Sequence, residues 1–378
     1  MTLPLAPRSW SWCLGALCAG ALLLSGPARG DDDEEDPVEE PPSVAATLEL
    51  LGQDRERVAL ELLEARPAQL VLTEARATLA RVDTSVPAAR VLGAALWLSS
   101  HVDREECRQL QRAVRGYLSD PLEPTLHASL LESLGALGEF GYLEQRLRRG
   151  PVTDAGPAAR GLCRSAHPAA LPALLATIGQ LEESAEEDAR RTAELAAAYP
   201  DAPPPPGAGQ DAARLAAALE ALRWFAARPG GERLARAVRD APSPSLPVLE
   251  ALLEARERAT RQATGEVGKA LLLHEAPPYR ALGVRLLVVS RDPETRDLVG
   301  DALRDDAPQV RAAAALAVVD LQARREIPRL IGLLEDGESE VRVAAHKALV
   351  RFAQREIPGR RLDWEQWWER EQAARQVE

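Results

Sequence analysis

Apolar residues in the C-terminal hundred residues follow a helical period that recurs every 31 positions. In each repeat they stand at i, i+3, i+4, i+7 and i+8, which places them on one face of an α-helix. The three superposable sets are Tyr279/Leu282/Gly283/Leu286/Leu287, Val310/Ala313/Ala314/Ala317/Val318 and Val341/Ala344/Ala345/Ala348/Leu349. Because one helical hairpin cannot bury such a face alone, the repeats must stack on their neighbours. The pattern therefore predicts an all-α chain, built as a right-handed α-solenoid of stacked helical hairpins.

The rest of the chain divides where this helical pattern breaks. Helical periods run from Val44 to about Ala198, with interruptions at proline-containing turns, and resume near Asp211. The run between them, YPDAPPPPGAGQ, has no apolar period and has polyproline II character. The expected divisions are divergent helical repeats in 44–198, a proline-rich loop or hinge in 199–210, helical repeats in 211–276 and regular repeats in 277–357.

Residues 1–30 have the pattern of a secretory signal peptide. Arg8 supplies an early positive charge, an apolar stretch runs from Cys13 to Leu24, and small residues stand at −3 and −1 of a cleavage site after Gly30. The apolar stretch is about twelve residues long, whereas a membrane-spanning helix needs roughly 20. An uncleaved anchor is the alternative, and no span is expected in the mature chain. The pattern predicts a secreted or periplasmic protein.

The charge of the chain is acidic and unevenly distributed. The formal net charge is −12, and eight acidic residues lie in the run Asp31 to Glu40. Residues 31–43 contain no apolar run to offset the entropy of ordering them, so we predict an acidic disordered tether, with an acidic binding tail as the alternative. Sequence-independent binding of nucleic acid requires a basic surface that displaces phosphate counterions, so DNA and RNA are not expected partners.

An arginine occupies the same place in each regular repeat, directly after the first apolar position of the helix. The three arginines are Arg280, Arg311 and Arg342. The units DDAPQVRAAAALAVVDL…REIPRLIGLL and EDGESEVRVAAHKALVRFA resemble the short HEAT-like repeat of the bilin-lyase type. The resemblance covers residues 277–357 and implies architecture more than activity, because many non-enzymes share the repeat.

The resemblance also implies a ladder of hydrogen bonds between successive repeats, made by turn aspartates and helix arginines. It pairs Asp305 with Arg311 and Asp336 with Arg342. For the first of the three arginines, the corresponding turn position holds His274, so that rung lacks its aspartate. The ladder is interpreted as structural, with a partner-binding stripe as the alternative.

A tryptophan-rich segment, residues 358–378, closes the chain. Trp364, Trp367 and Trp368 stand at i, i+3 and i+4, with an N-capping carboxylate expected at Asp363. We predict a capping helix that covers the apolar face of the last repeat, with an aromatic docking surface as the alternative. The segment resembles the ends of HEAT-repeat proteins exported by bacteria, whose functions are mostly unassigned.

Candidate chemistry in the mature chain is confined to scattered cysteines and histidines. Cys107 and Cys163 are separated by about one and a half helical hairpins, so whether they meet the Cα limit of about 7 Å for a disulfide stays open. These cysteines together with His101 and His167 are candidate ligands of a metal. Because no C-x-x-C or H-E-x-x-H motif is present, we predict no metal site and no cofactor.

The functional hypothesis follows from a regular stack without a catalytic constellation. Metal-dependent hydroxylases built from HEAT-like repeats use several His-Glu dyads, and this chain has one, His274-Glu275. It also has no G-x-S-x-G elbow and no phosphate-cradling glycine loop. We therefore predict an exported, non-catalytic scaffold that binds a protein partner in a concave groove formed by the second helices of the repeats. The alternatives are an auxiliary subunit or weak metal-dependent enzyme, and a structural envelope spacer.

Overall fold

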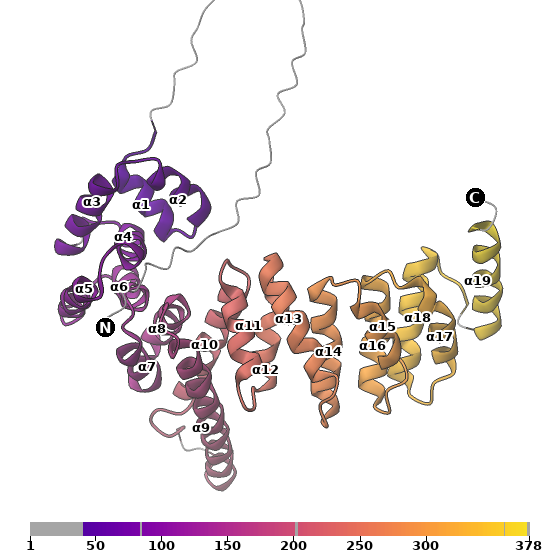
Figure 1. Ribbon diagram of the computed structural model, residues 1–378. Coiled ribbons are helices and arrows are strands. Elements are labelled where there is room, and N and C mark those ends of the chain that lie inside the picture. Colours follow the sequence, from indigo (N-terminus) through magenta and orange to yellow (C-terminus); the bar gives the residue numbers. More distant parts are fainter. Residues whose placement is uncertain (1–40, 84, 201–202, 359, 376–378) are drawn as a thin grey trace, which may run out of the picture. The chain divides into compact units, whose positions relative to one another are not determined.

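The computed structural model describes residues 41–83, 85–200, 203–358 and 360–375. The predicted signal peptide and the acidic run Asp31 to Glu40 lie outside these residues. Within them, the regular elements are 19 α-helices and three short 3₁₀-helices (Figure 1). The described part of the chain is an all-α solenoid of helical repeats, as the apolar period predicts. None of its helices is both long enough and apolar enough to cross a membrane.

Most of the helices are short, and they follow one another along the chain with turns between them. The first nine are α1 (Val44–Gly52), α2 (Glu56–Glu64), α3 (Ala68–Ala80), α4 (Ala88–His101), α5 (Arg104–Tyr117), α6 (Pro124–Ala136), α7 (Phe140–Arg149), α8 (Val152–Arg164) and α9 (Ala170–Ala198). The next are α10 (Gln210–Ala226), α11 (Gly231–Asp240), α12 (Leu246–Glu250), η1 (Ala251–Glu254), α13 (Arg258–Leu271), α14 (Pro277–Ser290) and α15 (Thr295–Ala302). The last are α16 (Pro308–Asp320), η2 (Arg324–Glu326), α17 (Ile327–Gly332), η3 (Leu333–Glu335), α18 (Ser339–Ala353) and α19 (Arg361–Arg375).

The first turn of a helix has backbone N–H groups without an intrahelical partner. At several helix starts a side chain accepts a hydrogen bond from such a group, or a proline, which has no N–H, stands there. The Ser43 side chain accepts a hydrogen bond from the Ala46 N–H, and the Asp103 side chain accepts one from the Glu106 N–H at 2.8 Å. Prolines begin α6, α14 and α16, where the missing N–H has no intrahelical partner to lose.

The arginine-bearing helices α14, α16 and α18 pack side by side and are called the first helices; α15 and α17 are the second helices (Figure 1). In α18 the whole predicted apolar set is buried. In α16 the buried surface differs from the predicted set: Ala313 is only half-buried, whereas Ala312, Ala315 and Val319, outside the set, are buried. This helix lies between α14 and α18, so both of its flanks contact a neighbour. A single-face pattern therefore underestimates the core of an inner repeat.

The N-terminal helices approach one another closely through glycines. A Cβ on Gly93 of α4 would overlap the Leu48 carbonyl of α1, and one on Gly135 of α6 would overlap the Gly161 carbonyl of α8. In both pairs the obstructing atoms belong to the backbone, which cannot rotate away as a side chain does.

Gly93→Ala is expected to lower the free energy of unfolding by about 1–3 kcal/mol, because α1 and α4 must separate to admit the methyl group. Gly116→Ala in α5 is the control, since a Cβ there meets no atom within 4 Å. It should raise stability by about 0.5–1 kcal/mol through helix propensity alone. Urea unfolding of both variants checks the difference, and equal effects would contradict the close approach.

The long helix α9 changes character along its length. Leu171, Leu174, Ile178 and Leu181 of its first half are buried, whereas no residue from Glu183 to Ala198 is. The predicted proline-rich loop follows it and leads to α10, which begins at Gln210.

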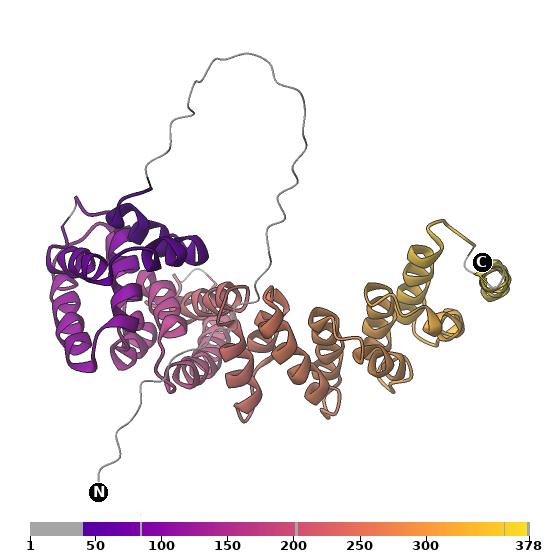
Figure 2. The same cartoon turned by 45° about the horizontal axis from the view of Figure 1, so that its top comes forward.

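The terminal helix α19 packs on α17 of the last repeat (Figures 1 and 2). Trp364 and Trp367 are buried, and their rings meet edge to face with centroids 5.5 Å apart. Trp368 is half-buried against the same apolar cluster. The expected N-cap at Asp363 is wrong, because α19 begins two residues earlier, at Arg361, and places Asp363 inside the first turn.

Candidate protein-binding surfaces

Two of the three repeat arginines, Arg280 and Arg311, form bidentate ion pairs with an aspartate of the following turn. Arg311 donates from Nε and Nη2 to the two carboxylate oxygens of Asp336, each at 2.9 Å. Its Nη1 donates to the backbone carbonyls of Asp305 and Asp306, at 2.8 and 2.9 Å. One planar guanidinium thus joins two successive turns, which is the geometry that arginine favours and lysine cannot reproduce.

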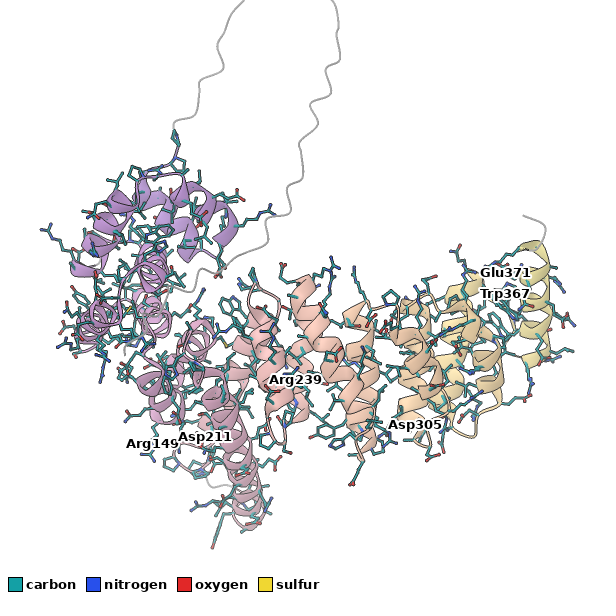
Figure 3. All side chains as sticks on the ribbon, viewed as in Figure 1. Arg149, Asp211, Arg239, Asp305, Trp367 and Glu371 are labelled. Atoms are coloured by element: carbon teal, nitrogen blue, oxygen red, sulfur yellow. The ribbon has the colours of Figure 1, made fainter. Side chains whose placement is uncertain are left out.

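The pairing differs by one repeat from that implied by the resemblance. The carboxylate of Asp305, in the turn before α16 (Figure 3), accepts from Arg280 at 2.8 Å, whereas Arg311 contacts Asp305 only through its carbonyl. Arg342 likewise contacts the Asp336 carbonyl at 2.7 Å, and its guanidinium has no carboxylate partner within the described residues.

The rung at Arg280 is complete although its own turn holds a histidine. Arg280 uses the backbone carbonyls of His274 and Glu275, at 3.0 and 2.8 Å, and any residue supplies a carbonyl. The carboxylate comes from the next turn, so the first rung needs no aspartate at position 274. His274 instead stacks on Tyr279, with ring centroids 4.2 Å apart.

Asp336→Asn is expected to weaken the acid dependence of stability. The hydrogen bonds from Arg311 hold the pKa of Asp336 below its ordinary value. A depressed folded-state pKa stabilises the protein above the unfolded pKa of about 3.9, and this contribution is lost as pH falls through the folded value. The variant should therefore be less stable than the wild type at neutral pH, and its stability should fall less than that of the wild type as the pH is lowered. Urea unfolding between pH 7 and pH 2.5 measures both effects. Asp306→Asn is the control, because only its backbone carbonyl enters the ladder; equal pH slopes in wild type and both variants would contradict this role.

A second charged cluster joins segments that are far apart in the sequence. Arg164, whose side chain is 6% exposed, donates to Asp54 at 2.6 Å and to Glu132 at 3.2 Å. Arg228 donates to the other oxygen of Asp54 at 2.8 Å. Both guanidiniums lie over the ring of Trp224, at 4.7 and 4.3 Å from its centroid. We call these residues the Arg164 cluster.

The Arg164 cluster shifts the pKa values of two carboxyl groups in opposite directions. Burial opposes ionisation of Asp54, but the two guanidiniums outweigh it and lower the pKa below the ordinary value. For Glu56, which is 3.7 Å from Arg164, burial dominates and raises the pKa. Sequence analysis missed this cluster, since no spacing rule relates Asp54 to Arg228, 174 positions later. The only local signal is Arg160 and Arg164 at i, i+4, both bonded to Glu132.

The structure does not bring the candidate metal ligands together. Cys107 and Cys163 are both free thiols. Cys163 is fully buried, which raises its pKa to about 12 and opposes the thiolate that a metal or an electrophile would need. His101 stacks on Trp97 and His167 stacks on Phe140. Across the described ranges, no three His, Cys, Asp or Glu side chains are placed to hold a metal ion.

A cleft of about 760 Å³ lies across the three first helices and is called the first-helix cleft. Its apolar residues include Leu316, which is 39% exposed, and Val343, which is 52% exposed. Small buried alanines form the floor between them. The charged residues of the rim are Arg285, Asp320, Glu340 and Lys347.

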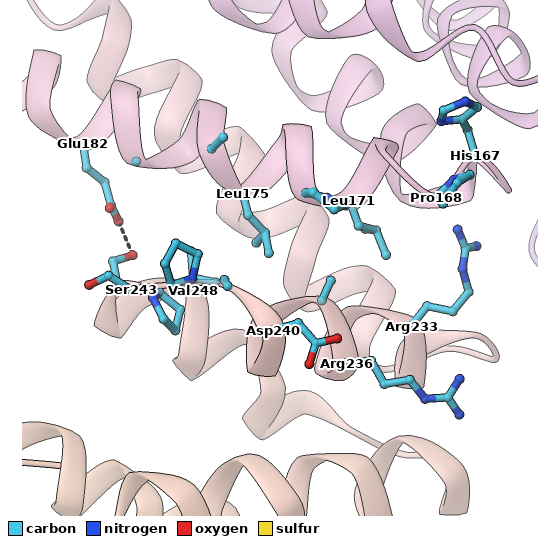
Figure 4. A pocket seen from close by; sticks show the side chains of 18 of the residues that line it. His167, Pro168, Leu171, Leu175, Glu182, Arg233, Arg236, Asp240, Ser243 and Val248 are labelled. Carbon is cyan, nitrogen blue, oxygen red and sulfur yellow. Dashed lines mark hydrogen bonds between the residues drawn. The ribbon is translucent and has the colours of Figure 1, made fainter.

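A second groove, of about 700 Å³, lies between α9 and α11 and is called the α9–α11 groove (Figure 4). Leu171 and Leu175 of α9 and Val248 of α12 line it, with prolines from the turns at its edges. Arg233 and Arg236 stand toward one end, and Glu182 stands at the other (Figure 4). The oxygen of Glu182 accepts a hydrogen bond from the Ser245 hydroxyl at 2.7 Å.

The sequence predicts that the partner-binding groove lies on the surface of the second helices. Neither the first-helix cleft nor the α9–α11 groove is lined by α15 or α17. In this chain the second helices are short, with eight and six residues, whereas the first helices have 13 to 15. The longer helices leave more side chains projecting between neighbours.

Comparison with known families supports the interpretation of the regular repeats as HEAT repeats. A model of HEAT repeats matches residues 266–350. This segment includes α14, α16 and most of α18, the helices joined by the arginine ladder. The chain is a HEAT-like repeat protein. No curated protein matches the sequence.

Several solved structures are similar to the chain at low sequence identity. Kap121p is 13% identical with a TM-score of 0.36, over 85% of this chain and 38% of that protein, so the chain spans well under half of Kap121p. Human deoxyhypusine hydroxylase is 16% identical with a TM-score of 0.28, over 82% of this chain and 97% of the enzyme. An engineered protein is 17% identical with a TM-score of 0.28, over 83% of this chain and 85% of its own.

Proposed function

We propose that this HEAT-like repeat protein is an exported scaffold that binds a protein partner at the first-helix cleft and catalyses no reaction. The observation that carries the proposal is the exposure of Leu316 and Val343 on adjacent stacked helices, above a floor of alanines. Large apolar side chains that share a rim with charged groups are typical of protein-binding surfaces.

The shape of the cleft favours a protein over a small molecule. It extends over three helices held at fixed spacing by the arginine ladder, so its apolar positions are presented without reorganisation. Preorganised anchors reduce the entropy that association must offset. The partner is expected to insert apolar side chains between Leu316 and Val343 and to pair its charges with the rim.

The proposal is tested by in-cell crosslinking, purification and mass spectrometry of the wild type and of Leu316→Glu/Val343→Glu. A partner present at constant ratio to the wild type should fall at least tenfold with the double variant. Leu195→Glu/Tyr199→Glu is the matched control, because it also adds two charges at exposed apolar residues, outside the cleft. Circular dichroism must show equal helicity in all three proteins. A partner that stays bound to the cleft variant would contradict the proposal.

Export is supported by the composition of residues 1–30 and is tested separately. The mature N-terminus of protein recovered outside the cytoplasm should be Asp31, directly after the expected cleavage site. N-terminal sequencing checks this. Protein that stays in the cytoplasm with residues 1–30 attached would contradict export and leave the binding proposal intact.

A further inference from the structure

We propose that the α9–α11 groove is a second docking site, for an apolar protein segment that carries a carboxylate at the end facing Arg233 and Arg236. The α9–α11 groove and the first-helix cleft share no lining residue. The proposal therefore does not depend on the function assigned to that cleft.

The two arginines at the basic end of the groove form no ion pair among the described residues. Arg233 is half-buried and donates to the carbonyl of Ser165, and no carboxylate lies within salt-bridge distance of it among the described residues. Arg236 is exposed, with no hydrogen bond or ion pair to any part of the chain that the structure describes. By contrast, Arg239 on the same helix donates to Asp240 at 3.0 Å, and Arg164 pairs with Asp54.

A half-buried guanidinium without an anion is costly, because desolvation is not offset by charge pairing. Burial also lowers the pKa of Arg233, which agrees with this environment. A carboxylate placed between Arg233 and Arg236 would accept charge-assisted hydrogen bonds from both. The ring of His167 lies at the same end of the groove. Asp240, the acidic side chain beside the two arginines (Figure 4), accepts a hydrogen bond from Arg239.

The middle of the groove selects an apolar occupant. Leu171 and Leu175 project from α9 toward α11 (Figure 4), and Val248 lies on the facing side. Four prolines, each with a fixed backbone φ, also line the groove. These prolines are Pro168, Pro172, Pro242 and Pro244. Apolar side chains entering the groove would displace water from all of these surfaces.

The end of the groove opposite the two arginines disfavours a second negative charge on the occupant. Glu182 lies at this end, where it accepts a hydrogen bond from Ser245. A uniformly acidic occupant would meet like charges there. This argues against the chain's own acidic run Asp31 to Glu40 and for a foreign segment with acidity at one end only.

The test uses random twelve-residue peptides displayed on phage and selected on the full-length protein. Enriched peptides should contain two or more large apolar residues followed at one end by Asp, Glu or the free C-terminus. Fluorescence anisotropy of the synthetic peptides should show at least tenfold weaker binding to Arg236→Glu. Arg191→Glu is the matched control, since it makes the same charge change at an exposed residue of α9 that does not line the groove, and it should bind within twofold of wild type.

Charge reversal distinguishes a direct contact from a disturbed fold. Replacing the acidic residue of the peptide with arginine should weaken binding to wild type and restore it to Arg236→Glu. Enriched peptides without acidic ends, equal binding by wild type and Arg236→Glu, or no enrichment at all would overturn the proposal. Competition by a synthetic peptide of residues 31–42 would also overturn it, in favour of an occupant from the same chain.

Discussion

Trp364→Ala is expected to lower the free energy of unfolding by about 3–5 kcal/mol, as for other large aromatic residues removed from a core. The side chain of Trp364 is fully buried, and its ring packs edge-on against His346 and Trp367. Alanine would leave a cavity between α19 and the last repeat. Urea unfolding measures the change.

The effect should be concentrated at the C-terminal end of the solenoid. In the regular repeats each helix pair packs on its neighbours, so the loss of a cap exposes the last interface first. Hydrogen exchange should accelerate in α17 and α18 before it does in α4 and α6. Trp368→Ala is the control, because Trp368 is only half-buried, and its cost should be smaller. Deleting residues 363–378 should promote aggregation. A truncated protein that stays monomeric with an unchanged melting temperature would contradict the capping role.

Arg164→Leu is expected to cost about 3 kcal/mol or more, because removal of one partner leaves buried charge uncompensated. Asp54 and Glu132 would each lose one of their two arginine partners, and Trp224 would lose one of its two cation–π contacts. The loss should be visible as faster proteolysis in the turn that contains Asp54. Chevron or equilibrium denaturation measures the magnitude.

Arg160→Leu is the control for Arg164→Leu, because it removes the same charge from a more exposed position. Arg160 donates to the same carboxylate of Glu132 at 2.6 Å, but its side chain is 32% exposed, against 6% for Arg164. Its replacement should therefore cost clearly less, and the turn at Asp54 should stay protected. Equal costs for the two variants would show that the Arg164 cluster does not tie the N-terminal turn to α8 and α10.

Local pattern predicted the repeats but not the contacts between distant segments. The apolar pattern within each 31-residue repeat predicts the helices and the buried set of α18. It can do so because the pattern relates residues that lie within one or two helical turns of each other. The extra burial of Ala312 and Val319 depends on neighbours on both sides, which the period does not encode. The Arg164 cluster depends on side chains up to 174 positions apart.

The ladder shows the same limit within the regular repeats. The sequence identifies the arginines and aspartates that take part, since their positions recur with the repeat. It does not identify which carboxylate each arginine reaches, because the aspartate 6 residues before Arg311 and the aspartate 25 residues after it both recur with the repeat. In the turn before α16, the backbone carbonyls of Asp305 and Asp306 face Arg311, and the Asp305 carboxylate does not. This backbone geometry determines which carboxylate Arg311 reaches. Both proposed docking surfaces likewise depend on how neighbouring helices pack.

The most direct test of the scaffold account places a photo-crosslinking amino acid at position 316 in living cells. Leu195 is the matched control position, because it has the same exposed fraction as Leu316, 39%, and lies on α9 outside the first-helix cleft. The account predicts one discrete protein adduct from position 316 and none from position 195. The absence of an adduct at 316, or the same adducts from both positions, would contradict it.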